Sequence, residues 1–220
     1  MNPAAASPMS DPAAPSNRNP ANTKPVNRKP IWVLIAMFFV PLAIAFVLYY
    51  GVDGWRPAGS TNHGDLVTPA RPLPDVTLPL AQGGAADPKL LHGKWTLVYI
   101  GSGQCDARCR EALTLIRQSR LALSDDMIRV QRVFLSTGEC CDRPYLEQEH
   151  AGLVVLQADS DSGSGLLREF SEAAGVPVGQ AGRIYIVDPL GNLMMSYAPT
   201  AAPRGLLEDL KKLLRLSHIG

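Results

Sequence analysis

Residues 95–109 read WTLVYIGSGQCDARC, and this segment is the most informative one about the fold. The run Trp95–Ile100 is continuously apolar apart from one threonine, which is typical of a strand buried on both faces of a sheet. A turn containing two glycines ends this run, and residues 106–123 then place apolar side chains along one helical face. Cys105 and Cys109 lie where the strand gives way to the helix. The stretch therefore predicts a strand–helix unit with two thiols at its junction.

The sequence around this unit predicts an α/β domain. Further strands are expected where short apolar runs recur, at residues 75–78, 128–135, 153–157, 183–187 and 193–197. Further helices are expected where apolar residues recur with helical spacing, at residues 166–174 and 206–216. The last two strands are joined by Asp-Pro-Leu-Gly-Asn, which favours a hairpin. A parallel start, an antiparallel hairpin and a covering helix make the thioredoxin-like plan, which we assign to residues 75–220.

The residues before this domain predict a membrane anchor. Residues 31–51 contain no charged residue, and as a helix they are long enough to cross the roughly 30 Å hydrocarbon core of a bilayer. A cleavable signal peptide would have a shorter apolar region followed by a small-x-small site, so the anchor is favoured. Residues 1–30, rich in Pro, Ala, Asn and Ser, are expected to be a disordered tail. Residues 52–74, rich in Gly and Pro, are expected to be a spacer.

Charge predicts the orientation of this single-pass protein. Four basic residues precede the apolar segment: Arg18, Lys24, Arg28 and Lys29. They predict that the tail stays in the cytoplasm and that the C-terminal domain is exported. In a bacterium the anchor would lie in the inner membrane and the domain in the periplasm, where cysteine pairs form disulfides. The formal net charge of +1 does not indicate nucleic acid as a partner.

Cys105 and Cys109 are the first candidate site. At a helix N-terminus the dipole favours the thiolate, which is the form that attacks disulfides and binds soft metals. If both residues were helical, their Cβ atoms would lie about 5–6 Å apart, a separation that a metal ion bridges. A disulfide, with Cβ atoms roughly 3.5–4.5 Å apart, requires Cys105 to lie in the loop. Thiol redox chemistry, Cu(I) ligation and an inert structural disulfide therefore all stay open.

Cys140 and Cys141 form a second candidate thiol pair. They follow the second predicted strand, as Cys105 follows the first. Because the carboxyl ends of parallel strands meet at the same edge of a sheet, we expect both pairs to open onto one edge. Our hypothesis is that the pairs communicate, by thiol–disulfide exchange or by sharing a metal. The alternative is a local vicinal disulfide or a loop staple.

The spacing of the four histidines does not indicate a metal site. His63, His92, His150 and His218 each lack a second ligand at metal spacing. We therefore expect each of them to be an ordinary surface residue.

Three motifs together resemble the Sco/SenC family: residues 93–101 (GKWTLVYIG), the Cys105/Cys109 pair, and residues 184–192 (IYIVDPLGN). That family consists of membrane-anchored, thioredoxin-fold proteins that help assemble the copper centre of cytochrome c oxidase. The resemblance covers residues 73–216. It implies that Cys105 and Cys109 are the catalytic and metal-binding residues, acting by thiol redox or copper handling. It also implies a respiratory oxidase subunit, or another assembly factor, as the partner.

The sequence departs from the family pattern in two places. The prolines usual beside the two cysteines are replaced by Asp106 and Arg110. The family's third copper ligand, a histidine shortly before the strand at 184–187, is replaced by Gln180, and an amide is a poor substitute for imidazole at a soft metal. The resemblance thus implies a divergent member with weak copper handling. Two other functions stay open: a general thiol–disulfide oxidoreductase, and a binding module with structural disulfides.

Overall fold

The computed structural model describes residues 28–51, 61–170, 176–217 and 219–220, which fall in two compact units, Met1–Ala58 and Gly59–Gly220. Most of the expected tail, residues 1–27, lies outside the described residues. So do the first nine residues of the expected spacer, 52–60, the end of the helix predicted at 166–174, and His218. Each unit is therefore described by itself.

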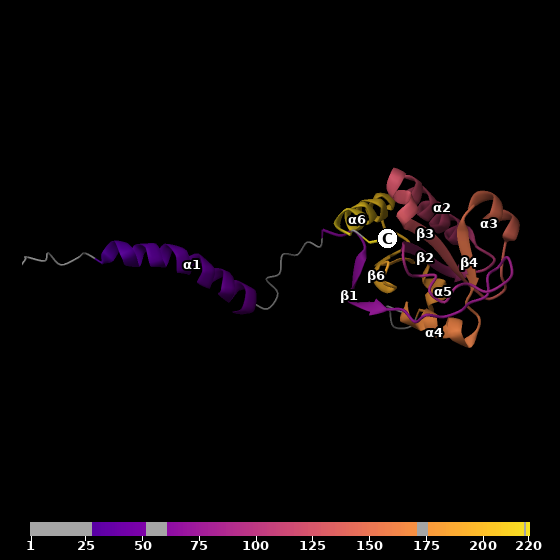
Figure 1. The fold of residues 1–220 in the computed structure, drawn as a ribbon, viewed down its shortest axis with the longest axis horizontal. Helices are drawn as coiled ribbons and strands as arrows, with labels where there is room; N and C mark the ends of the chain where they lie inside the picture. The colour runs from indigo at the N-terminus through magenta and orange to yellow at the C-terminus, as the bar shows by residue number, and fades with distance from the viewer. Residues whose placement is uncertain (1–27, 52–60, 171–175, 218) are drawn as a thin grey trace, which may run out of the picture. The chain divides into compact units, whose positions relative to one another are not determined.

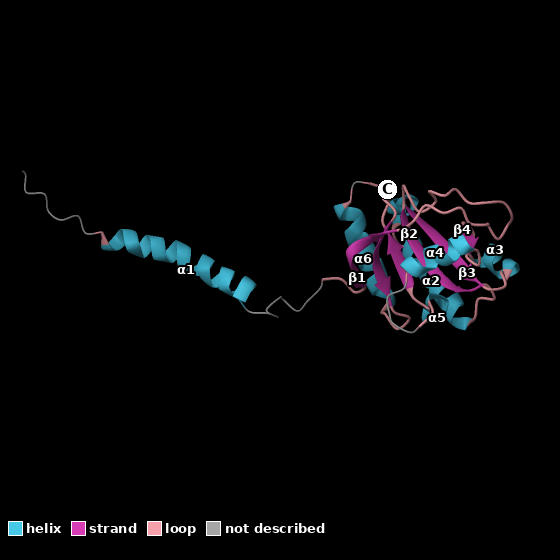
Figure 2. Cartoon of the chain, turned by 90° about the horizontal axis from the view of Figure 1, so that it is seen from below, coloured by secondary structure: helices cyan, strands magenta, loops and turns pink. Residues whose placement is uncertain are grey.

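Helix α1, Lys29–Gly51, is the described part of the first unit (Figure 2). It contains Pro41 and carries no acidic residue in its first turn and no basic residue in its last. At 1.5 Å per residue its length is about 35 Å. The helix is long and apolar enough to cross a membrane, as the uncharged run predicted.

The second unit is built on a six-stranded sheet with the order β1-β6-β5-β2-β3-β4 (Figure 1). The strands are β1 Asp65–Pro72, β2 Trp95–Ser102, β3 Val130–Thr137, β4 Leu153–Gln157, β5 Ile184–Val187 and β6 Asn192–Tyr197. β2, β3 and β4 are parallel, whereas β5, β6 and β1 join by antiparallel pairing. The parallel start and the antiparallel hairpin confirm the predicted thioredoxin-like α/β plan.

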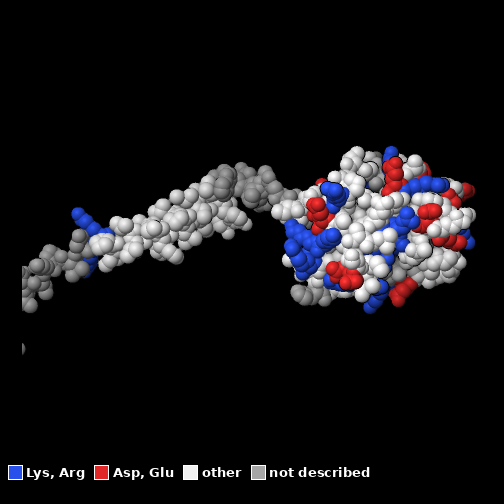
Figure 3. Space-filling model, turned by 90° about the horizontal axis from the view of Figure 1, so that it is seen from above, with Lys and Arg blue, Asp and Glu red and all other residues white. Residues whose placement is uncertain are grey.

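Helices cover both faces of this sheet. They are α2 Ala107–Leu121, the 3-10 helix η1 Ser124–Arg129, α3 Arg143–Glu149, α4 Asp161–Glu169, α5 Val178–Ala181 and α6 Pro203–Leu216. Buried side chains of α2 and α6 share one core with β2, β3, β5 and β6. Leu166 of α4 and the adjacent Phe170 pack with the opposite faces of β2, β3 and β5. On the face drawn in Figure 3, Lys and Arg side chains are interspersed with Asp and Glu.

The structure differs from the sequence expectations at the start of the domain. The expected spacer extends to residue 74, but β1 pairs with β6 and forms an edge of the sheet. The strand expected at 75–78 is absent, because those residues form a connection without regular structure. β1 contains Pro69 and Pro72 and has mostly exposed side chains. It therefore lacks the apolar alternation that identifies a strand, and only its pairing with β6 defines it.

The register of β2 and β3 positions the cysteines. The two strands pair in parallel along their whole length, and Ser102 lies opposite Thr137 at their carboxyl ends. The segments that follow, residues 103–109 and 138–142, therefore leave the sheet at the same edge. This is the edge at which the sequence predicted both cysteine pairs.

Candidate functional site

Cys105 and Cys109 are joined in a disulfide, with their Cα atoms 5.0 Å apart. Cys105 lies in the loop before α2, and Cys109 lies in the first turn of that helix. The backbone of Cys105 has φ +46°, in the left-handed region, which for a non-glycine residue costs about 1–2 kcal/mol. Of the alternatives that the four-residue spacing left open, the structure shows the disulfide with Cys105 in the loop. Strained backbone of this kind persists where the surrounding structure imposes it.

Asp106 changes the electrostatics expected at this helix N-terminus. It is the N-cap of α2, and its carboxylate accepts a hydrogen bond of 2.9 Å from the backbone N–H of Cys109. One backbone N–H at the start of α2 is therefore already paired with a carboxylate. A carboxylate at this position partly offsets the positive end of the helix dipole.

The disulfide is closed off from solvent. Cys105 is 1% exposed and Cys109 is 2% exposed. Residues 139–142, which we call the cover segment, pack directly on the loop that leads to Cys105. The N–H of Asp142 donates to the carbonyl of Gly103 over 3.2 Å, and a Cβ atom added at Gly103 would lie 2.6 Å from the Cα of Cys140. The two thiols are brought together as predicted, but they are not open to the solvent.

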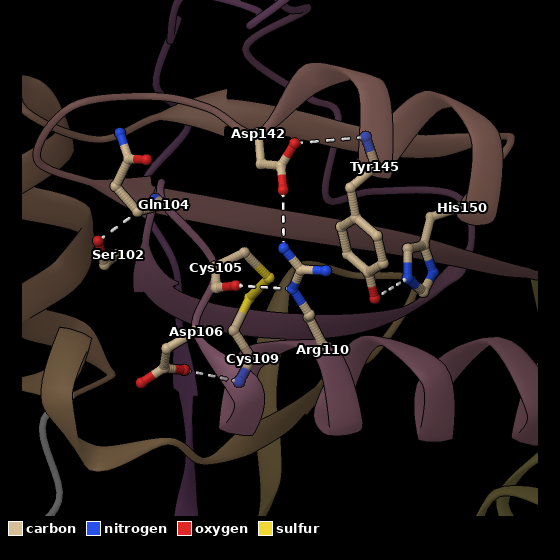
Figure 4. Close-up of a disulfide and its surroundings, with 9 residues drawn as sticks. All are labelled: Ser102, Gln104, Cys105, Asp106, Cys109, Arg110, Asp142, Tyr145 and His150. Carbon is tan, nitrogen blue, oxygen red and sulfur yellow. Dashed lines mark hydrogen bonds and ion pairs between the residues drawn. A yellow bond between two sulfur atoms is a disulfide. The ribbon is translucent and has the colours of Figure 1, made fainter.

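Arg110 links the cover segment to the Cys105 loop (Figure 4). Its Nε donates to the carbonyl of Cys105 over 3.2 Å, and its Nη2 donates to Asp142 over 2.8 Å. Its guanidinium carbon lies 4.3 Å from the ring centroid of Tyr145 in α3. The sequence contains no local signal for this cluster, since Arg110 and Asp142 are 32 positions apart.

Cys140 and Cys141 form the second disulfide, within the cover segment. Both residues are half-buried and pack against the core that contains Cys105 and Cys109. Cys141 also lines a cavity of about 240 Å³ together with Arg143 and other residues of α3. The structure therefore brings all four cysteines to one edge of the sheet, with the second pair in the vicinal disulfide that the sequence left as an alternative.

His150 corrects the expectation that every histidine is a surface residue. It is 2% exposed, and its Nε2 lies 2.9 Å from the hydroxyl of Tyr145. Burial, assisted by the charges of Arg117 and Arg132, lowers the pKa of His150 to about 4. The imidazole is therefore neutral near pH 7 and can serve as a hydrogen-bonding partner of Tyr145 without adding charge beside the cover segment.

Gln180 lies on the other side of the Cys105 loop. It is exposed on α5 and lines a cleft of about 260 Å³ together with Asp106, Arg108 and Tyr99. Burial, with a further contribution from Asp106, raises the pKa of Tyr99 to about 12, so this phenol stays protonated. The position that the resemblance assigned to a copper ligand is thus beside the cysteine loop, but it carries an amide.

The donor set does not fit a copper ion. Both sulfurs of Cys105 and Cys109 are bonded to each other, which removes them as thiolate ligands. Gln180 supplies an amide in place of a soft donor or an imidazole. Within the described ranges, no group of three or more His, Cys, Asp or Glu side chains is arranged to hold a metal. We therefore assign no chemical step to copper.

A family model described as a transmembrane-like, thioredoxin-like, C-terminal domain matches residues 95–217, which is more than half of the chain. The chain belongs to this family. The match begins at β2 and includes both disulfides and every later strand and helix of the second unit. No curated protein matches the sequence significantly.

Solved structures show the same fold in other proteins of this thioredoxin-like class. The apo Sco1 protein from Thermus thermophilus is 21% identical, with a TM-score of 0.57, and the match covers 71% of this chain and 99% of that one. Yeast Sco1 with copper bound is 17% identical, with a TM-score of 0.56 and coverages of 69% and 96%. A thioredoxin-family thiol:disulfide interchange protein from Chlorobium tepidum is 15% identical, with a TM-score of 0.51 and coverages of 67% and 99%. The fold resemblance to Sco proteins is confirmed.

Proposed function

We propose that this chain is a membrane-tethered thiol redox protein of the Sco type that assists assembly of the copper centre of cytochrome c oxidase. Its working group is the Cys105–Cys109 pair, which cycles between a disulfide and a dithiol. One observation carries the proposal: two cysteines, paired in a disulfide, occupy the carboxyl edge of the parallel strands in a Sco-like fold, and one of them has strained backbone.

The anchor supports this role. Helix α1 would cross the inner membrane, with the basic residues before it in the cytoplasm and the second unit in the periplasm. Disulfides persist in that compartment. A tether also raises the effective concentration of the domain near a membrane-bound oxidase subunit or its assembly factors, which are the proposed partners.

The burial of the pair argues against a general thiol–disulfide oxidoreductase. Such an enzyme needs an exposed, nucleophilic cysteine that meets many protein disulfides, whereas Cys105 and Cys109 are closed off beneath the cover segment. A partner that displaces this segment is favoured instead. We expect the full-length protein in detergent micelles to reduce insulin at a rate no higher than dithiothreitol alone.

The same burial favours one competing function, a binding module in which both disulfides are structural. The two functions separate in cells that lack this chain. We expect the wild-type chain to restore the copper content and activity of the oxidase, and the variant Cys105→Ser/Cys109→Ser to fail while reaching the same membrane level by immunoblot. Full restoration by the double variant would establish the binding module and refute the redox role.

Copper handling is tested through position 180. In the fully reduced full-length protein, we expect Gln180→His to raise Cu(I) affinity at least tenfold, because imidazole adds a third suitable donor beside the two thiolates. Anaerobic competition with a chromophoric Cu(I) chelator measures this affinity. Gln148→His, on the exposed surface of α3, is the matched control and should leave it unchanged. Equal affinities for Gln180→His and the wild type would show that position 180 does not face the thiols.

A further inference from the structure

We propose that the Cys140–Cys141 disulfide receives electrons from an external protein dithiol and passes them to Cys105–Cys109 by thiol–disulfide exchange. This relay rests on the proposed function, in which Cys105–Cys109 is the working disulfide. It gives the Cys140–Cys141 pair a redox role in place of a purely structural one. It also explains how the buried Cys105–Cys109 disulfide can be reduced.

Access to the two disulfides differs. Cys105 and Cys109 are 1% and 2% exposed, whereas Cys140 and Cys141 are half-buried. Cys141 lines a cavity of about 240 Å³, and the exposed Arg143 lies at the same cavity. A cation beside this opening attracts an incoming thiolate. An external dithiol therefore meets the second pair first.

The second pair also lies against the first. The cover segment packs on Gly103, two residues before Cys105, where a Cβ added at Gly103 would meet the backbone of Glu139 and of Cys140. Arg110 connects the carbonyl of Cys105 to Asp142, the residue after Cys141. Both cysteines of the second pair pack against the core cluster that contains Cys105 and Cys109. We call Cys105–Cys109 the inner disulfide and Cys140–Cys141 the outer one. Cys140 has its backbone against the loop that leads to the inner disulfide, whereas Cys141 lines the cavity.

The exchange balances in two stages. In the first, a donor thiolate attacks the sulfur of Cys141, and the Cys140–Cys141 bond breaks with its electron pair on Cys140. The second donor thiol then displaces Cys141, so the donor leaves as a disulfide. In the second stage, the Cys140 thiolate attacks a sulfur of the inner disulfide and releases one thiolate there. Cys141 then attacks Cys140, which restores the outer disulfide and releases the second inner thiolate. Two electrons and two protons pass from the donor to Cys105 and Cys109.

A rate measurement tests the relay. The oxidised full-length chain in detergent micelles is mixed with reduced thioredoxin, a protein dithiol, and samples are acid-quenched, alkylated and mapped by mass spectrometry. We expect thiols at Cys140 and Cys141 to precede those at Cys105 and Cys109. In Cys140→Ser/Cys141→Ser, we expect the inner disulfide to be reduced at least tenfold more slowly. An unchanged or faster rate in a variant with native circular dichroism overturns the relay.

A trapped intermediate tests it independently, even where the double variant does not fold. In Cys141→Ser the Cys140 thiolate attacks the inner disulfide but has no partner to resolve the product. We expect mass spectrometry to find Cys140 linked to Cys105 or Cys109. The matched variant Cys140→Ser leaves only Cys141 and should yield less than a tenth as much of such a link. Absence of the link in Cys141→Ser overturns the relay.

The relay and the proposed function fail differently. Suppose that Cys105→Ser/Cys109→Ser is inactive in cells, but that Cys141→Ser forms no link from Cys140 to Cys105 or Cys109. The redox function of Cys105–Cys109 is then supported, and the relay is refuted because another route reduces this pair. If that variant is active in cells, the proposed redox function itself is refuted.

Discussion

Replacing Asp209 with alanine is expected to lower the free energy of unfolding of the second unit by about 3 kcal/mol. Asp209 lies on α6 and is 2% exposed. Its carboxylate accepts hydrogen bonds from the N–H of His63 at 2.7 Å and from the N–H of Gly64 at 3.0 Å. The hydroxyl of Tyr197 also donates to it, at 2.9 Å. Alanine would leave the buried Gly64 amide unpaired, remove the acceptor of the Tyr197 hydroxyl on α6, and detach residues 63–64, which lead into β1. Urea unfolding of the full-length protein measures the loss.

The effect of Asp209→Ala should depend on pH. Burial alone would raise the pKa of Asp209, but the hydrogen bonds from Gly64, Tyr197 and His63 outweigh it and lower that pKa below its ordinary value of 3.8. A carboxyl group whose pKa is lower in the folded state stabilises the fold above the unfolded pKa. That stabilisation is lost as the pH falls through the folded pKa. The difference in stability between the wild type and the variant should therefore be largest near pH 7 and shrink below about pH 3.8.

Glu208 supplies the matched control for this prediction. Its side chain is 60% exposed, and it contacts His63 Nε2 at 3.3 Å. Because exposed ion pairs contribute little, Glu208→Ala should change the free energy of unfolding by less than about 1 kcal/mol. If the two alanine variants were equally stable, the carboxylate of Asp209 would not be what attaches the start of β1 to α6.

Replacing Gly103 with alanine is expected to displace the cover segment. The new Cβ would lie 2.4 Å from the carbonyl oxygen of Glu139 and 2.6 Å from the Cα of Cys140, and both are backbone atoms that cannot rotate away. Overpacking of this kind costs about 1–3 kcal/mol. We expect the amide of Asp142, which donates to Gly103, to exchange its hydrogen at least tenfold faster. Hydrogen-exchange mass spectrometry of the oxidised protein measures this rate.

Gly165 provides a glycine for comparison. It lies within α4, and the nearest atom to an added Cβ is the end of the flexible Arg168 side chain at 3.7 Å. Gly165→Ala should raise the free energy of unfolding by up to about 1 kcal/mol, because alanine favours the helix. It should leave exchange at Asp142 unchanged. Slow exchange at Asp142 in Gly103→Ala would mean that the loop before Cys105 accommodates the Cβ without moving the cover.

Much of the fold was predictable because it follows from local patterns. The run Trp95–Ile100 became β2, buried on both faces, and the run at 153–157 became β4. The amphipathic spacing at 206–216 lies within α6, whose apolar side covers the sheet. In each case one short stretch carries the whole signal, since the period of apolar residues sets both the type of element and its buried face. The pairing of Cys105 with Cys109 was predictable only in part. The four-residue spacing allows a disulfide when Cys105 lies in a loop, but it also allows other arrangements.

Local sequence patterns are enough to predict the apolar helix α1, the α/β order and the edge of the sheet at which four cysteines gather. Three features depend on the folded chain as a whole: the inner disulfide is buried, with the cover segment packed on the loop before it; Arg110 links that segment to the Cys105 loop; and Asp209 holds residues 63–64, which lead into β1. The physical reason is distance along the chain. Arg110 meets Asp142 across 32 positions, and His63 meets Asp209 across 146, so neither contact leaves a periodic trace in local sequence. Burial of a thiol depends on what packs over it, and here that is another loop.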